Sequence, residues 1–218
     1  EEKGEVAFDT ETCSLDPHQA DLIGVSLSTQ IGKACYVPIG HNSKKSIDKI
    51  KVLEKLKPLL EDPSIKKIGQ NIKFDFIVLF KHGIFISSME DTMLMSYVLD
   101  AGKNRHNMDT LSEIHLNHKT ITFKDLVGTG KKEISFAEVD IEKAKDYAAE
   151  DADITLRLYK KFYKSLKEEK MINIYEVFEK PMIKILAHME LEGIKIDKKS
   201  LKNLSLTFGK KIDEIQKE

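Results

Sequence analysis

Hydrophobic and polar residues alternate near the start of the chain, which is the pattern of half-buried β-strands. The first alternating segment covers residues 5–15 (EVAFDTETCSL), and two more follow at 21–28 and 33–39. Short polar connections separate the three segments. The sequence therefore predicts a three-stranded antiparallel meander at the start of the fold.

The spacing of apolar residues then changes to that of a helix. The first predicted helix covers residues 46–60, with Ser46 as its N-cap, and Pro63 ends this element. A short strand is predicted at 65–69. Because a helix precedes it, we expect this strand to pair in parallel with a neighbour and to make the sheet mixed.

Most of the remaining chain has helical periodicity. Further helices are predicted at 71–82, 89–99, 109–116, 122–127, 140 to about 169, and 198–218. Gly83 ends the helix at 71–82. Near the C-terminus, Pro181 is expected to interrupt a helical run that Gly193 ends, and residues 194–197 (IKID) are expected to form a short strand.

Composition limits the class of protein. Of the 218 residues, 41% are hydrophobic, so the chain can form a full core as one large domain, or one domain plus part of another. The formal net charge is −1, so any basic binding surface must be local. The two cysteines, Cys13 and Cys35, lack CxxC spacing, which excludes a disulfide scaffold and fits a reducing compartment.

The sequence also predicts where the protein works. No apolar run approaches the ~20 residues that a membrane span needs, and no signal peptide opens the chain. We therefore expect a cytoplasmic protein with no membrane partner, and we separately expect a monomer.

Candidate chemistry begins in the first strand. Its alternation places Asp9 and Glu11 on one face, two residues apart, at the strand end. Two neighbouring carboxylates repel each other, and a divalent cation with oxygen ligands relieves that repulsion. The alternative interpretation is a solvated acidic turn.

Two further acids lie on predicted helices. Asn71 and Asp75 are four residues apart and share a face, and Asp75 lies among apolar neighbours. Asp75 therefore needs a hydrogen-bond or metal partner if it is buried; the alternative is that it lies at the edge of the helix, exposed to solvent. Tyr147 and Asp151 are one turn apart on the long helix, where the alternative is a packed ring beside a solvated acid.

Taken in order, these three motifs resemble those of the DEDD exonucleases, in the subclass with a Tyr in the third motif. The proofreading 3′→5′ exonuclease domain of bacterial DNA polymerase I is similar to this chain in the segments GQNIKFDF, EDTMLMSYVLDAG, NHKTITFKDLVG and YAAEDADITLRLY. The resemblance implies an α/β fold, a ribonuclease-H-like mixed sheet flanked by helices, with a short helical C-terminal extension. It also implies an exonuclease domain over residues 1–173 and the truncated start of a polymerase domain over 174–218.

The resemblance further implies which residues act in catalysis. Asp9, Glu11, Asp75 and Asp151 match the four acids that bind two divalent cations, Mg2+ or Mn2+, and Tyr147 matches the tyrosine that orients the attacking water. The implied reaction removes 5′-mononucleotides from DNA 3′ ends by a two-metal-ion mechanism. All four acids are present, which argues for activity.

Substrate-binding residues also follow from the resemblance. Leu15 and Phe123 match positions that hold the terminal base. The other substrate-binding candidates, several of them matching positions near the phosphates, are Thr10, Gln70, Asn71, Arg105 and His106. The expected partners are a single-stranded or frayed DNA 3′ end and the rest of the polymerase chain. Two alternatives remain: an RNA-processing DEDD exonuclease of the ribonuclease D kind, and a catalytically inert scaffold of a polymerase.

Overall fold

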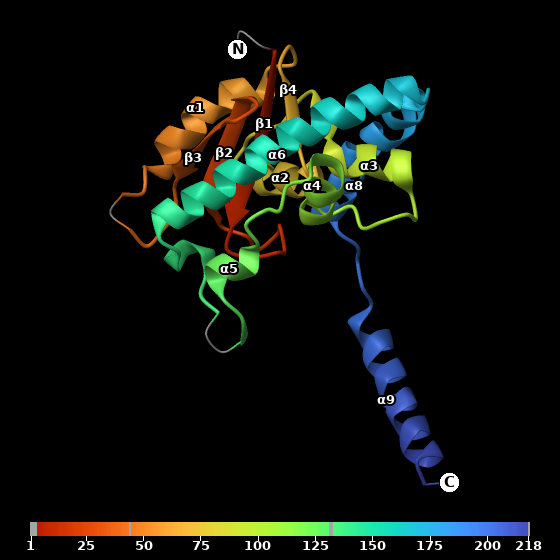
Figure 1. The fold of residues 1–218 in the computed structure, drawn as a ribbon. Coiled ribbons are helices and arrows are strands. Elements are labelled where there is room, and N and C mark those ends of the chain that lie inside the picture. Colours follow the sequence, from red (N-terminus) through yellow and green to blue (C-terminus); the bar gives the residue numbers. More distant parts are fainter. Residues whose placement is uncertain (1–3, 44, 131–132, 218) are drawn as a thin grey trace.

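A mixed five-stranded sheet forms the centre of the computed structural model, which describes residues 4–43, 45–130 and 133–217 (Figure 1). The strands are β1 (Glu5–Thr12), β2 (Leu22–Gln30), β3 (Lys33–Pro38), β4 (Lys66–Gly69) and β5 (Met89–Asp91), in the order β3-β2-β1-β4-β5. Strands β1, β2 and β3 form the predicted antiparallel meander, whereas β4 pairs in parallel with β1 and β5 in parallel with β4. The predicted mixed sheet is confirmed.

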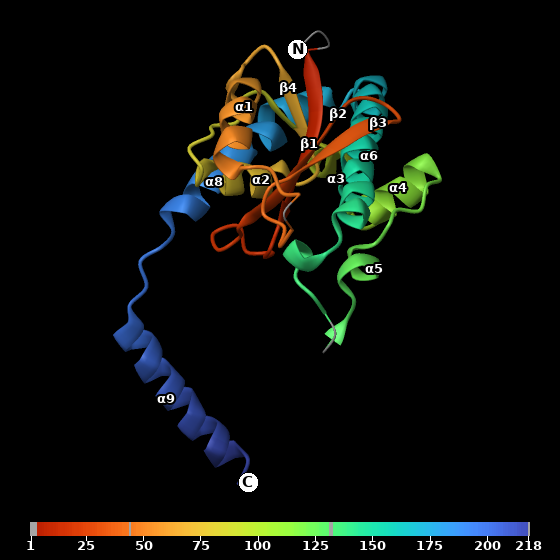
Figure 2. The ribbon, with the colours of Figure 1, turned by 90° about the vertical axis from the view of Figure 1, so that its left-hand side faces the viewer.

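Helices cover both faces of this sheet (Figure 2). The α-helices in the described ranges are α1 (Lys49–Glu61), α2 (Ile72–Phe80), α3 (Thr92–Asp100), α4 (Met108–Leu116), α5 (Phe123–Val127), α6 (Ile141–Glu168), α7 (Ile172–Ile174), α8 (Lys180–Glu192) and α9 (Lys198–Ile215). Buried residues of α1, α2 and α8 share one core cluster, and those of α3, α4 and α6 share another on the opposite face. The sheet therefore lies between these two clusters, and a smaller third cluster includes Ile23 of β2 and Ala144 of α6.

The alternation in β1 decides which side chains meet which helices. Phe8 packs in the core of α1, α2 and α8, whereas Ala7 packs in the core of α3, α4 and α6. Because side chains alternate along a strand, Asp9 and Glu11 lie on the Ala7 side and face α6. The acids thus stand on the face of the sheet that the longest helix crosses.

Two predicted helix starts are wrong. Residues 89–91 form β5, and the helix begins only at Thr92, because the Asp91 carboxylate accepts hydrogen bonds from Met93 N and Leu94 N as an N-cap. Likewise, α1 begins at Lys49 and its N-cap is Asp48 in place of Ser46, with Lys51 N donating to Asp48 over 3.0 Å. In both segments apolar periodicity extends beyond the true cap, so it places the helix start too early.

The C-terminal segment also differs from expectation. The run from Ile172 to Glu192 stays helical through Pro181, because a wider π turn at Tyr175–Glu179 precedes the proline. Such a turn relieves the clash of the proline ring with the carbonyl four residues earlier. The predicted strand at 194–197 is wrong, since this segment is irregular and exposed and pairs with no strand of the sheet.

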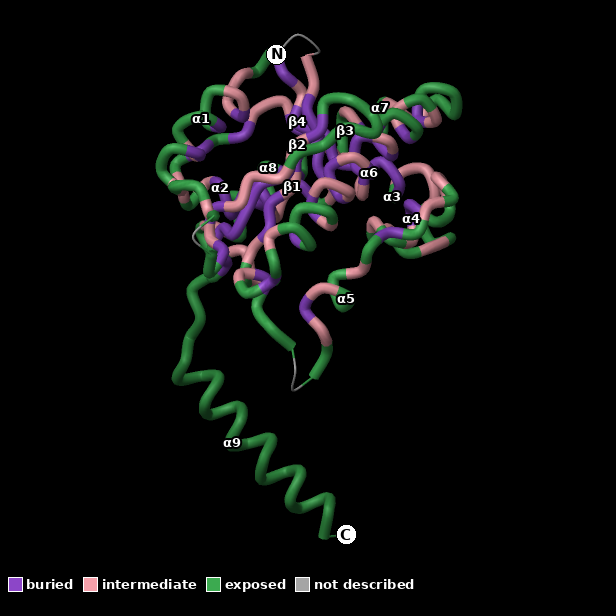
Figure 3. Tube along the Cα trace, turned by 60° about the vertical axis from the view of Figure 1, so that its left-hand side comes forward, coloured by how far each residue is buried: buried purple, intermediate pink, exposed green. Residues whose placement is uncertain are grey.

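Helix α9 projects from the rest of the fold, and none of its described residues is buried (Figures 1 and 3). Its exposed side chains include large apolar ones, such as Leu201 and Phe208. Even so, neither α9 nor any other helix in the described ranges is both long and apolar enough to cross a membrane.

Candidate active site

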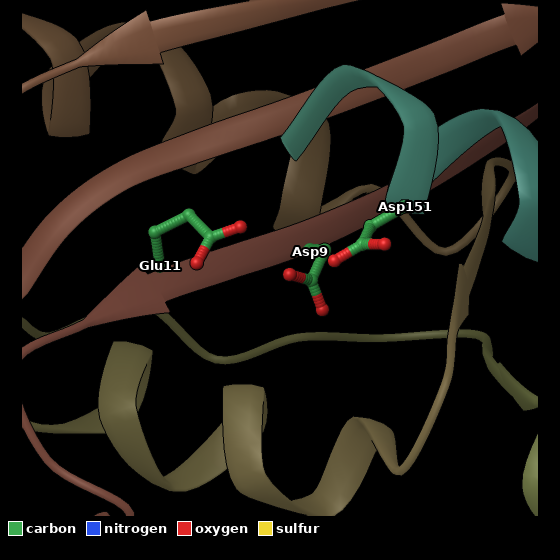
Figure 4. Close-up of side chains that lie close together, drawn as sticks. All are labelled: Asp9, Glu11 and Asp151. Carbon is green, nitrogen blue, oxygen red and sulfur yellow. The ribbon is translucent and has the colours of Figure 1, made fainter. Parts of the chain in front are cut away.

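Three carboxylates gather between the central strand and the crossing helix. Oxygens of Asp9, Glu11 and Asp151 all lie within 4.8 Å of one another (Figure 4). Asp9 and Glu11 project from β1, and Asp151 projects from α6. The predicted first and third motifs are therefore brought together by the fold.

The sequence of α6 explains how a short aspartate side chain can reach the sheet. Ala144, Ala148 and Ala152 repeat at one-turn spacing and are fully buried, so the helix can approach the strands closely. The helix begins at a regular cap, with Glu142 N donating to the Asp140 carboxylate over 3.0 Å. Asp151 is consequently held at a fixed height above β1.

Asp75 reaches the site from the opposite face of the sheet. Its Oδ1 accepts hydrogen bonds from Thr10 N at 3.0 Å and Thr10 Oγ1 at 2.5 Å, and only 2% of the residue is exposed. The parallel pairing of β1 with β4 ends at Ala7, so the Thr10 amide uses this carboxylate as its partner. Asp75 therefore lies beside Asp9 but is fixed to Thr10, outside the group of three.

Burial and mutual repulsion make all four carboxylates hard to ionise. Loss of water raises the pKa of Asp9 to about 7. It also raises the pKa values of Glu11, Asp75 and Asp151 well above their usual range, and the negative charge of Asp9 adds to each of these shifts. Without a cation, the folded protein thus favours protonated forms of these acids.

Tyr147 stands one turn before Asp151 on α6, and the charge of the Asp151 carboxylate acts on its hydroxyl group. Burial, and then the negative charge of Asp151, raise the pKa of Tyr147 above its usual range. The hydroxyl therefore stays protonated at neutral pH. It can orient a polar group but cannot serve as a strong base.

The acids fit a divalent cation. Glu11 Oε1 is buried and has no hydrogen-bond partner among the described residues. None of the ion pairs found in the described ranges includes Asp9, Glu11, Asp75 or Asp151. Because a buried carboxylate without a partner is costly, and hard divalent cations prefer oxygen ligands, the donor set matches such an ion.

Metal-free protein should lose stability as the pH rises. A carboxyl group whose pKa is raised in the folded state stabilises the fold below its unfolded pKa, near 4, and this contribution disappears as the pH passes the folded pKa. For Asp9, whose pKa in the folded protein is raised to about 7, this stabilising contribution is lost as the pH rises to about 7. We expect the melting temperature in chelator to fall by a few degrees between about pH 5.5 and pH 8, since ~1 kcal/mol corresponds to about 2–4 °C.

Excess Mg2+ provides the control for this pH dependence, because a bound cation keeps the carboxylates ionised and flattens the slope. Differential scanning fluorimetry at matched ionic strength measures both curves. Equal slopes with chelator and with Mg2+ would show that the acidic cluster does not set the pH dependence.

The two predicted base-binding residues, Leu15 and Phe123, both lie at the surface. Leu15 is 94% exposed in the segment after β1, and Phe123, the first residue of α5, is 42% exposed. The Phe123 ring lies 6.1 Å from the Phe136 ring and 6.3 Å from the Tyr147 ring, measured between centroids. Neither side chain is a core residue, and Phe123 borders the site through Tyr147.

Of the other predicted substrate-binding residues, Thr10 lies in β1, Gln70 and Asn71 lie just before α2, and Arg105 and His106 lie shortly before α4. Gln70 Nε2 donates to the His106 carbonyl oxygen over 2.8 Å, and His106 Nδ1 lies 2.9 Å from Ser96 Oγ. Asn71 and Arg105 are exposed. Gln70 and His106 therefore hold each other, whereas Asn71 and Arg105 are free to meet a ligand.

Tyr36 is a neighbour of the site that sequence reasoning missed. Burial, and then the charge of Glu11, raise the pKa of Tyr36, and the Tyr36 hydroxyl lies 2.7 Å from His41 Nε2. Gly24, which pairs with Glu11 across the sheet, leaves room for this ring, because a Cβ there would lie 2.1 Å from the Tyr36 hydroxyl. Only strand register brings these residues together, so no local signal identifies Tyr36.

Fold and site together define a ribonuclease-H-like nuclease, in which acids of a central strand meet acids of flanking helices. A family model described as 3′–5′ exonuclease matches residues 1–167. The chain belongs to this family of 3′–5′ exonucleases, whose members depend on divalent metal. The predicted family and the ribonuclease-H-like fold are confirmed.

Individual relatives agree with this assignment. DNA polymerase I of Rhizobium leguminosarum is 44% identical over 93% of this chain and 22% of the relative. The chain spans 22% to 25% of the length of the first curated relatives it matches, and it corresponds to the 3′–5′ exonuclease domain of DNA polymerase I homologues.

Among solved structures, Brucella melitensis NrnC with bound Mg2+ has a TM-score of 0.67 and 26% identity, covering 87% of this chain and 86% of NrnC. RNase D of Escherichia coli has a TM-score of 0.64 and 16% identity over 84% of this chain and 45% of that one, which shows a shared fold only.

Proposed function

We propose that this 3′–5′ exonuclease domain removes 5′-mononucleotides from the 3′ ends of DNA, as the proofreading part of a longer DNA polymerase I. The observation that carries the proposal is the gathering of oxygens of Asp9, Glu11 and Asp151 within 4.8 Å of one another, where Glu11 Oε1 has no hydrogen-bond partner among the described residues. The names of the curated relatives support DNA as the substrate and the remaining polymerase chain as the partner.

Asp9, Glu11, Asp75 and Asp151 are the proposed ligands of two divalent cations, Mg2+ or Mn2+. When bound, such ions stabilise negative charge on the phosphodiester and lower the pKa of an attacking water. The chain's own residues fix the geometry: Thr10 orients the Asp75 carboxylate through two hydrogen bonds. The Tyr147 hydroxyl stands beside Asp151, where it orients the attacking water by donating or accepting a hydrogen bond.

The Tyr147→Phe variant should be slower but not inactive, because it loses the water-orienting hydroxyl and keeps the packed ring. We expect the single-turnover rate at saturating Mg2+ to fall roughly 10²-fold, the lower end for positioning and proton-transfer groups. Tyr163→Phe, which removes a hydroxyl from the same helix away from the acids, is the matched control. A loss as complete as that of a carboxylate variant would contradict the proposed role of Tyr147.

Leu15 and Phe123 are the proposed contacts of the terminal base. Extracting a paired base costs a few kcal/mol, and least when the base is mismatched or already single-stranded. A site that holds the last base therefore favours single strands and frayed ends. Stacking on a side chain depends little on base identity, so we expect little sequence preference.

The Phe123→Ala variant should raise KM for single-stranded DNA by about tenfold, since stacking on one side chain contributes ~1–3 kcal/mol. Metal affinity and melting temperature should change little, because Phe123 is partly exposed. Phe178→Ala, at another exposed phenylalanine, controls for general effects of the change. A lower melting temperature with unchanged KM would instead make Phe123 a structural residue.

An RNA-processing exonuclease is the remaining alternative, suggested by the fold shared with RNase D. Digestion of DNA and RNA single strands of one sequence separates the two proposals. We expect faster digestion of DNA, and the reverse preference would favour the alternative. The four intact acids argue against an inert scaffold.

Packing supports a folded unit that extends beyond the expected division between residues 173 and 174. Tyr175, Ile183 and Ala187 are buried in the same clusters as residues of the sheet. We propose that the exonuclease unit ends near Gly193 and that α9 starts the polymerase domain. A cytoplasmic monomer and the absence of a membrane partner remain predictions.

A further inference from the structure

One buried carboxylate closes the amino-terminal ends of two helices. Asp91, at the end of β5, is 1% exposed. On the α2 side its oxygens accept hydrogen bonds from Asn71 N at 3.1 Å and Ile72 N at 2.9 Å. On the α3 side they accept from Met93 N at 2.8 Å and Leu94 N at 3.3 Å.

Helix α2 depends on this remote cap because its own N-cap residue provides none. Asn71 has a left-handed backbone, with φ of +61°, and its side chain makes no capping hydrogen bond. The first N–H groups of a helix need acceptors, and Asp91, at the end of strand β5, supplies acceptors for those of α2. Asp75 belongs to the first turn of this helix. The cap therefore fixes the turn from which Asp75 reaches Thr10.

The position of Asp91 is itself held by the core. The Tyr175 hydroxyl accepts a hydrogen bond from Asp91 N at 2.9 Å and donates to Glu90 Oε2 at 2.9 Å. Tyr175 is fully buried. A rigid chain of contacts thus runs from the core through Asp91 to the start of α2.

We propose that Asp91 is a positioning residue of the exonuclease site, which aligns the Asp75 carboxylate by capping α2 from β5. Asp91 touches neither substrate nor metal in this arrangement and acts through Asp75 and its contact with Thr10. The inference rests on the proposed function, in which Asp75 is a metal ligand. It predicts that a change at Asp91 is felt at Thr10, which lies beyond the capped helix.

Amide exchange of metal-free protein, followed by NMR, tests this coupling. In Asp91→Asn, an amide replaces one acceptor oxygen, so the Thr10 N–H should exchange at least about fivefold faster as its bond to Asp75 weakens. Mn2+ affinity, measured by calorimetry, should fall about 10- to 100-fold, as is typical when a partner of a metal ligand is removed. The matched control is Asp48→Asn, which makes the same change at the N-cap of α1.

A second variant separates positioning from folding. Serine is a good N-cap, so Asp91→Ser should keep the cap of α3 while leaving the donors of α2 without acceptors. It should reproduce both effects with a smaller loss of melting temperature. If Thr10 exchange and Mn2+ affinity stay at wild-type values in Asp91→Ser, the inference is wrong.

The Asp75→Asn variant distinguishes this inference from the proposed function. Weaker Mn2+ binding in Asp75→Asn, with no effect in either Asp91 variant, would overturn the positioning role alone. Unchanged Mn2+ binding in Asp75→Asn would overturn the proposed metal role of Asp75, and with it the inference.

Discussion

The exonuclease rate of the Asp9→Asn variant should be at least ~10³-fold lower than that of the wild-type protein. A cation held by a direct ligand stabilises the charge that develops in the transition state by several kcal/mol, and ~1.4 kcal/mol corresponds to a tenfold change in rate. The asparagine side chain has nearly the same shape, so the fold should persist. Removing one charge also relieves repulsion with Glu11 and Asp151. The metal-free variant should therefore melt at a higher temperature than the wild-type protein.

Rate and melting temperature are measured together in this experiment, because opposite changes exclude unfolding as the cause of lost activity. Asp21→Asn is the matched control: it removes the same charge from an exposed acid just before β2. The control should keep the wild-type rate. An Asp9→Asn protein with near wild-type activity would remove Asp9 from the proposed set of ligands.

Removal of divalent metal should abolish activity completely, and addition of Mg2+ should stabilise the fold. A ligand at about 100 times its Kd contributes ~2.7 kcal/mol. In a chain of this size each kcal/mol corresponds to ~2–4 °C, so we expect the melting temperature to rise by roughly 5–10 °C.

Asp151→Asn serves as the control for the metal experiment, since it lacks one of the three gathered carboxylates and should show a much smaller rise. Calcium-free buffers treated with chelator give the metal-free baseline. Activity that persists in chelator, or equal stabilisation of both proteins by Mg2+, would contradict the proposed metal site.

Local periodicity predicted how the residues within two pairs lie relative to each other, and the family resemblance marked these pairs as parts of one site. Alternation in β1 placed Asp9 and Glu11 on one face, and helical spacing placed Tyr147 and Asp151 one turn apart. The fold then brings Asp9, Glu11 and Asp151 together, as the order of motifs implied. These residues could be predicted because each pair lies within a single regular element.

Contacts between distant elements could not be predicted in the same way. The bond from Thr10 to Asp75 exists because the pairing of β1 with β4 ends at Ala7 and leaves the Thr10 amide without a partner in β4. The strand of residues 89–91 exists because it pairs with β4, although its apolar spacing continues that of the following helix. Both features depend on which strands pair and in which register, and local sequence patterns do not predict this.

Digestion of single-stranded DNA labelled at its 5′ end, with and without Mg2+, tests the central claim most directly. We expect a ladder of labelled products that shorten one nucleotide at a time from the 3′ end, release of 5′-mononucleotides, and no reaction in chelator. Asp9→Asn should give no ladder under the same conditions. Metal-independent cleavage, or immediate release of the 5′ label as a mononucleotide, would contradict the account.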